Sequence, residues 1–136
     1  MTKLKPQIIV SSQDLHRLET MLEHQSKLTA TMAHLEDELA RAEVVEPQQV
    51  PHNVVSMNAK VLVLIAPSTE PKEIHLVYPH DFRGDAGQVN VLAPIGAAIS
   101  GLAEGQEIEW PQPDGHLMQV KIIKVLYQPE REGDYL

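Results

Sequence analysis

The sequence predicts an α+β protein of 136 residues, in which a helical hairpin precedes a bent antiparallel sheet that carries one short helix. Three observations lead to this prediction. Apolar residues recur at helical spacing in the first third of the chain, and they recur at strand spacing from residue 54 onward. A polar, proline-containing stretch, EPQQVPHN at residues 46–53, separates the two patterns. We therefore expect residues 1–48 to form the hairpin and residues 49–136 to form the second domain.

The hairpin is predicted from two apolar series. Leu15, Leu18 and Leu22 lie on one helical face, and Ser11 and Asp14 ahead of them have the spacing of a capping box. The second series has heptad spacing and consists of Leu28, Met32, Leu35, Leu39 and Ala42. A short break joins the two, which favours antiparallel arms of roughly 13 and 18 residues. The pair either packs on the rest of the protein or protrudes from it.

Within the part of the chain with strand spacing, the first expected strand begins at residue 60. Residues 60–66, KVLVLIA, are continuously apolar, as in a central strand, whereas residues 72–79, KEIHLVYP, alternate. Further strands are expected at residues 89–92 and 106–110, and a long closing strand at residues 116–129. Simple alternation places one set of side chains on a single side of this last strand: Leu117, Gln119, Lys121, Ile123, Val125 and Tyr127.

The short helix is expected directly after the strand at residues 89–92. Pro94 suits the first turn of a helix, because the missing N–H breaks no hydrogen bond there. Gly101 and Gly105 can end the helix, since glycine adopts positive φ at little cost. One face of this helix carries Ile95, Ala98, Ile99 and Leu102.

Charge argues against autonomous binding to nucleic acid. The chain has 19 acidic residues and 11 Lys and Arg residues, a net charge of −8. Residues 12–48 alone hold eight acids and three bases, and an acidic hairpin of this kind suits a basic protein cleft. There is no cysteine, and no apolar run resembles a secretory signal or a membrane span. We expect a cytoplasmic protein that does not bind a membrane.

The sequence contains no pattern that indicates catalysis. The seven histidines are scattered, without metal-ligand spacing, and no phosphate-binding glycine loop or nucleophile motif occurs. Glu36, Asp37 and Glu38 form the tightest acidic cluster, which a solvated helix face explains. We therefore expect no catalytic residue, metal or cofactor, and we interpret the chain as a binding protein and not an enzyme.

The segment APIGAAISGLAEGQEIEW, at residues 93–110, resembles the corresponding helix motif of the GreA/GreB family of bacterial transcription factors. The segments VVSMN, VYP and YQPE fit the same family. The resemblance covers most of the chain, is strongest from about residue 51 to residue 136, and is closest to the short Rnk branch, the regulators of nucleoside diphosphate kinase. The resemblance implies a coiled-coil hairpin followed by an FKBP-like domain. It also implies that RNA polymerase is the partner, bound near the mouth of its secondary channel.

The family motif that docks on polymerase corresponds to Ala93, Pro94 and Ile95. In Gre factors, acidic residues at the hairpin tip hold a catalytic magnesium ion for RNA cleavage. The tip of this chain is formed by Glu23, His24, Gln25, Ser26 and Lys27. One carboxylate beside a lysine is a poor magnesium site. The resemblance therefore implies a regulator that occupies the Gre position without stimulating cleavage.

Three other functions stay open. The chain could assist transcript cleavage as a Gre-type elongation factor. It could regulate nucleoside diphosphate kinase by direct contact, whereas an effect through transcription would be indirect. It could also be a prolyl isomerase, although an aromatic content of 4% supplies little material for the aromatic pocket of such enzymes.

Overall fold

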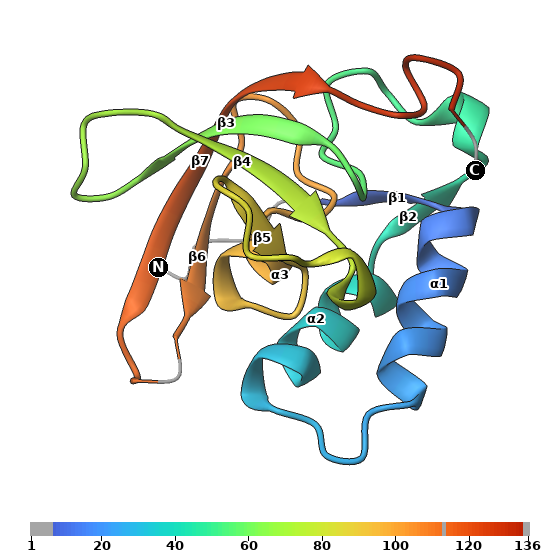
Figure 1. Ribbon diagram of the computed structural model, residues 1–136, viewed down its shortest axis with the longest axis horizontal. Helices are drawn as coiled ribbons and strands as arrows, with labels where there is room; N and C mark the ends of the chain where they lie inside the picture. Colours follow the sequence, from blue (N-terminus) through green and yellow to red (C-terminus); the bar gives the residue numbers. More distant parts are fainter. Residues whose placement is uncertain (1–6, 113, 135–136) are drawn as a thin grey trace.

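The computed structural model describes residues 7–112 and 114–134. Two helices and a five-stranded sheet dominate the fold (Figure 1). The first part of the chain contains β1 (Ile9–Ser11), α1 (Ser12–Glu23), α2 (Ala30–Ala40), β2 (Glu43–Val45) and the 3-10 turn η1 (Pro47–Gln49). The second part contains β3 (Lys60–Ile65), β4 (Lys72–Val77), the 3-10 turn η2 (Pro79–Asp81), β5 (Gln88–Asn90), α3 (Pro94–Ile99), β6 (Glu107–Pro111) and β7 (Leu117–Tyr127).

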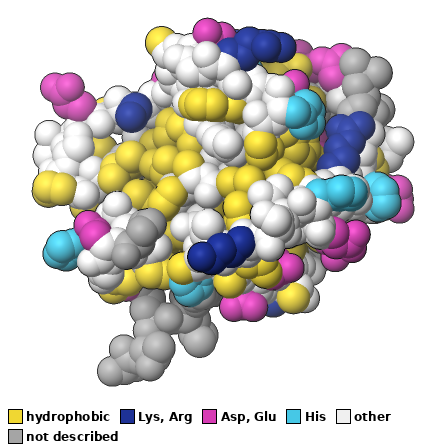
Figure 2. All heavy atoms as spheres, turned by 60° about the horizontal axis from the view of Figure 1, so that its bottom comes forward, with side chains coloured by type: hydrophobic (Ala, Val, Ile, Leu, Met, Phe, Trp, Pro, Cys, Tyr) yellow, Lys and Arg dark blue, Asp and Glu magenta, His cyan; other side chains and the backbone are white. Residues whose placement is uncertain are grey.

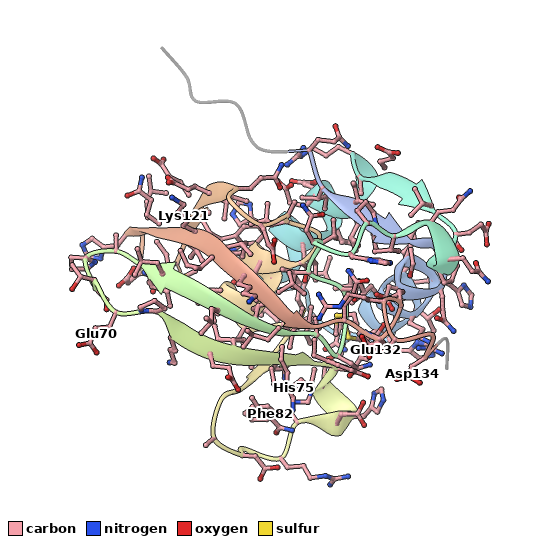
Figure 3. All side chains as sticks on the ribbon, turned by 90° about the horizontal axis from the view of Figure 1, so that it is seen from above. Glu70, His75, Phe82, Lys121, Glu132 and Asp134 are labelled. Carbon is pink, nitrogen blue, oxygen red and sulfur yellow. The ribbon has the colours of Figure 1, made fainter. Side chains whose placement is uncertain are left out.

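Each strand expected from residue 60 onward is present, but the sheet is not wholly antiparallel. Its order is β5-β4-β3-β7-β6, and β5 runs parallel to β4. The prediction of an antiparallel sheet is therefore wrong at this edge. The chain leaves β4 through η2 and a long loop, and this crossover lets it enter β5 in the same direction. Figure 3 shows the loop, marked by Phe82, projecting from the edge of the sheet.

The closing strand β7 does not keep simple alternation. Val120, Ile122 and Val125 are buried, so the step between inward-facing residues changes from two to three. The pairing with β3 shifts register twice, and each shift is a β-bulge. Ile123 and Leu126 are the extra residues of these bulges and have no paired residue on β3. Both are exposed, by 39% and 37%. The single side predicted for Leu117 to Tyr127 is therefore wrong, because each bulge reverses the side on which the following residues lie.

The helical hairpin packs on the sheet domain. Leu18, Leu22, Leu35 and Leu39 are buried and belong to the same hydrophobic core as the strands and α3. The rings of His34 on α2 and Trp110 on β6 pack in a T-shaped arrangement, with 5.8 Å between ring centroids. Figure 1 shows α2 next to α3 below the sheet. The periodicity left open whether the hairpin packs on the rest of the protein or protrudes from it. The structure shows the packed arrangement.

A short parallel pair that the sequence analysis missed closes the base of the hairpin. β1 leads into α1, and β2 leaves α2 and pairs with β1. The backbone N–H of Ile9 also donates to the carbonyl of Gly101, at 3.1 Å, so β1 contacts the end of the α3 region. Gly101 has φ +83°, and a Cβ placed there would lie 2.8 Å from the Cβ of Ile8. Only glycine fits this contact between the hairpin and the second domain.

We expect Gly101→Ala to lower the free energy of unfolding by about 2–4 kcal/mol, because it combines backbone strain with a clash. Gly105→Ala is the matched control, since Gly105 has φ +85° but open space around a Cβ. Urea unfolding of the two variants measures the difference. Equal losses of stability would show that the contact with Ile8 contributes nothing.

Candidate functional site

The segment predicted to dock on a partner forms the entry to α3. Ala93 is the residue before the helix, with φ −76° and ψ 152°, and Pro94 occupies the first helical position. The Asn90 side chain accepts a hydrogen bond from the Leu92 N–H at 2.9 Å, and the Asn90 carbonyl accepts one from the Ala93 N–H, also at 2.9 Å. The two bonds fix the turn between β5 and α3. Ala93, Pro94 and Ile95 are all half-buried.

Gly96 holds the helix entry close to the preceding strand. A Cβ at this position would lie 2.3 Å from the carbonyl oxygen of Asn90. The backbone of α3 therefore packs directly on the turn that carries the docking segment. The segment thus has a fixed position relative to the sheet and is not a mobile loop end.

The surface around this turn is apolar. Val89, Leu92 and Ile95 pack against the core but stay partly exposed. Figure 2 shows hydrophobic side chains gathered at the centre of the face that forms the bottom of Figure 1, where α3 and the end of the hairpin lie. An exposed apolar area of this kind, surrounded by polar side chains, is typical of a protein-docking surface.

The predicted tip residues lie at the end of the hairpin. Glu23 ends α1, and His24, Gln25, Ser26 and Lys27 lie in the connection to α2. The His24 Nδ1 lies 2.7 Å from the Thr20 carbonyl, and the Gln25 amide donates to the Met21 carbonyl at 3.2 Å. Both side chains therefore fold back on α1. All five residues except Gln25 are exposed.

The tip offers little to a metal ion. Glu23 is its only carboxylate, and in residues 7–112 and 114–134 no group of three or more His, Cys, Asp or Glu side chains could hold a metal. The arms are also short: 12 residues in α1 correspond to about 18 Å at 1.5 Å per residue. Among the described residues, 7–112 and 114–134, no helix is long and apolar enough to cross a membrane.

A buried polar junction, which the sequence analysis missed, joins α1 to the second domain. Asp14 is 4% exposed, and its carboxylate accepts hydrogen bonds from the Met57 N–H at 3.1 Å and from the Tyr78 hydroxyl at 3.3 Å. The Ser11 side chain caps α1 by accepting from the Asp14 N–H at 2.9 Å, as predicted. The Asp14 carboxylate, however, points away from α1. Its partners Met57 and Tyr78 follow it in the sequence by 43 and 64 residues.

The C-terminal segment completes this junction. The Ser56 hydroxyl donates to the Glu130 carboxylate at 2.6 Å, and Glu130 is 8% exposed. The Gln128 amide donates to the carbonyls of Pro51 and Val54, at 2.8 and 2.7 Å. Residues 128–130 are thereby fixed against the segment that enters β3. Only the fold brings these residues together, so no local pattern could indicate them.

Burial raises the pKa of Asp14 from 3.8 to about 6, the Met57 N–H opposes this rise, and the Glu130 carboxylate adds to it. Burial likewise raises the pKa of Tyr78, and the Asp14 charge reinforces the effect. Because the folded-state pKa of Asp14 exceeds its unfolded value, the folded state binds the proton more tightly. The stability from this group is fully present below pH 4 and is lost as the pH rises to about 6.

We expect Asp14→Asn to flatten the pH dependence of stability. Asparagine accepts from the Met57 N–H and donates to the Tyr78 oxygen, but it cannot ionise. The loss of unfolding free energy between pH 4 and pH 7 should shrink by on the order of 2–3 kcal/mol relative to the wild type. Urea unfolding at the two pH values measures this, with Asp37→Asn on the exposed face of α2 as control. An unchanged pH profile would contradict the assignment.

Comparisons with known proteins agree with this architecture. The family model "Transcription elongation factor, GreA/GreB, C-term" matches residues 50–127, and "Rnk N-terminus" matches residues 6–45. The chain is 36% identical over 133 residues to the regulator of nucleoside diphosphate kinase of Escherichia coli K12, covering 97% of this chain and 98% of that protein. It is 33% identical over 106 residues to transcription elongation factor GreA of Thermodesulfovibrio yellowstonii, covering 78% of this chain and 66% of GreA.

A solved structure shows the same fold. It is the prokaryotic transcription elongation factor GreA/GreB from Nitrosomonas europaea, which is 46% identical and superposes with a TM-score of 0.73. The match covers 90% of this chain and all of that one. The chain therefore belongs to the GreA/GreB family of transcription elongation factors, and its N-terminal part is the Rnk segment, as the sequence resemblance predicted.

Proposed function

We propose that this protein is a transcription regulator that binds RNA polymerase at the Gre-factor site, at the mouth of the secondary channel, and does not stimulate transcript cleavage. The hairpin tip is the observation that carries the second half of this proposal. Glu23 is the only carboxylate among residues 23–27, and the arms contain only 12 and 11 residues. Such a tip lacks the carboxylate ligands that magnesium needs. The arms are also too short to carry the tip far from the docking surface.

The entry to α3 supports the docking half of the proposal. Ala93, Pro94 and Ile95 form a stiff turn in an apolar surface, and their family counterparts contact polymerase. A preorganised docking segment loses little conformational entropy on binding. α2 lies next to α3, and its exposed Glu36 and Asp37 suit the basic entrance of a channel.

We expect purified core RNA polymerase to retain the wild-type protein in a pulldown and to lose Pro94→Asp. Aspartate would place a charge in the apolar contact, which costs about 2 kcal/mol or more, enough to abolish retention at micromolar concentration. Pro71→Asp is the matched control, because Pro71 is exposed in the turn between β3 and β4, away from α3. Retention of both variants would rule out the docking site, and loss of both would indicate a nonspecific charge effect.

Arrested elongation complexes should show no shortening of the RNA when this protein is added, whereas a cleavage-competent Gre factor should shorten it under the same conditions. The expected result follows from the single tip carboxylate. Cleavage that disappears in Glu23→Gln would contradict the proposal. It would favour the alternative of a Gre-type factor that assists cleavage.

Several narrower expectations belong to the same proposal. We propose a binding protein of the cytoplasm with no enzymatic activity, and the FKBP-like and coiled-coil descriptions of its two parts stay predictions. A link to nucleoside diphosphate kinase would then act indirectly, through transcription. A pulldown that recovers the kinase without polymerase would favour direct regulation instead.

A further inference from the structure

A second concave surface lies apart from the docking segment. It is a groove of about 600 Å³ between the outer side of α1 and the end of β4 with η2. The volume falls in the range of small-molecule sites, and it exceeds the 310 Å³ of the adjoining groove on the far side of Arg17. Neither α3 nor the turn before it contributes to the lining of the larger groove.

The lining of this groove contains an arginine and two histidines, although the protein as a whole is acidic. His16 and Arg17 project from α1, and His80 lines the opposite wall. Asp81 is the only acid in the lining, and it lies 3.3 Å from the His80 ring. On the right of Figure 2, histidine, basic and acidic side chains lie together beside the hydrophobic surface. One arginine and two imidazoles that can donate hydrogen bonds, against one carboxylate, suit an anionic ligand.

The rest of the groove is suited to a larger, ring-containing body. Met21 and the buried ring of Tyr78 supply apolar lining, and the rings of Tyr78 and His80 stack with 5.6 Å between centroids and an interplanar angle of 11°. The Tyr78 hydroxyl is already directed to Asp14, which fixes the ring in place. The groove is far larger than a phosphate group alone requires. An anion attached to a planar or apolar ring would use both parts of the lining.

We propose that this groove binds a small phosphorylated ring compound, with the chemistry of a nucleoside phosphate. The phosphate contacts Arg17 together with His16 and His80, and the ring lies over Met21 and the Tyr78–His80 stack. This site is independent of polymerase docking, because it uses α1 and η2 while the docking segment precedes α3. It can therefore be tested on the free protein.

Isothermal titration of the full chain with adenosine diphosphate, without polymerase, tests the proposal. Inorganic phosphate and adenosine, titrated separately, are the two partial probes, and both should bind more weakly than the diphosphate. Arg17→Gln should weaken binding by about tenfold through loss of a charge-assisted hydrogen bond. Asp81→Asn should strengthen it by about twofold to fivefold, because it removes the only acid of the lining.

Arg83→Gln is the matched control, since Arg83 is exposed in the loop after η2 and does not line the groove. Its affinity should equal that of the wild type. Equal losses in Arg17→Gln and Arg83→Gln would overturn the proposal, as would diphosphate binding no tighter than adenosine or phosphate. Arg17→Gln could lose binding only because it destabilises the fold, which a lower melting temperature would reveal. In that case Asp81→Asn is the test, because it is expected to strengthen binding, and an unchanged affinity in Asp81→Asn overturns the proposal.

Discussion

The buried hydrogen bonds of the Asp14 side chain constrain how the two parts of this protein fit together. The carboxylate lies on the first turn of α1 and accepts from the Met57 N–H and the Tyr78 hydroxyl of the second domain. A buried carboxylate is unfavourable unless its oxygens accept hydrogen bonds. Because both donors belong to the second domain, these bonds form only while the hairpin lies on the sheet. Together with the Ile9–Gly101 contact they place the hairpin next to α3, and hence next to the proposed docking surface.

Local signals predicted those parts of the fold that depend on neighbouring residues. The cap at Ser11, the apolar series of α1 and the start of α3 at Pro94 appear as expected. The second series is only partly confirmed: α2 has 11 residues where about 18 were expected, Leu28 and Ala42 lie outside it, and Leu28 is 46% exposed. The structure differs from these expectations where contacts between residues far apart in the sequence determine the fold. The parallel edge strand β5 depends on the path of the loop after η2, and the bulges at Ile123 and Leu126 depend on pairing with β3. Neither leaves a periodic pattern in the chain.

The candidate site divides in the same way. The tip residues could be located because a break between two apolar helices is a local feature, and the structure places them at the end of the hairpin. The family resemblance alone assigned Ala93 to Ile95 to docking, and that assignment stays a prediction. Asp14 was interpreted only as part of a cap, because its contacts with Met57 and Tyr78 span 43 and 64 residues. The groove beside Arg17 likewise requires that α1 and η2 be brought together, which no spacing indicates.

This protein is proposed to occupy the Gre-factor site without supplying the chemistry of cleavage. Competition measures this most directly: a fixed amount of a cleavage-competent Gre factor acts on arrested elongation complexes while the concentration of this protein increases. We expect RNA cleavage to fall progressively, and a higher Gre concentration to restore it. Cleavage that stays constant, or that rises as this protein is added, would contradict the claim.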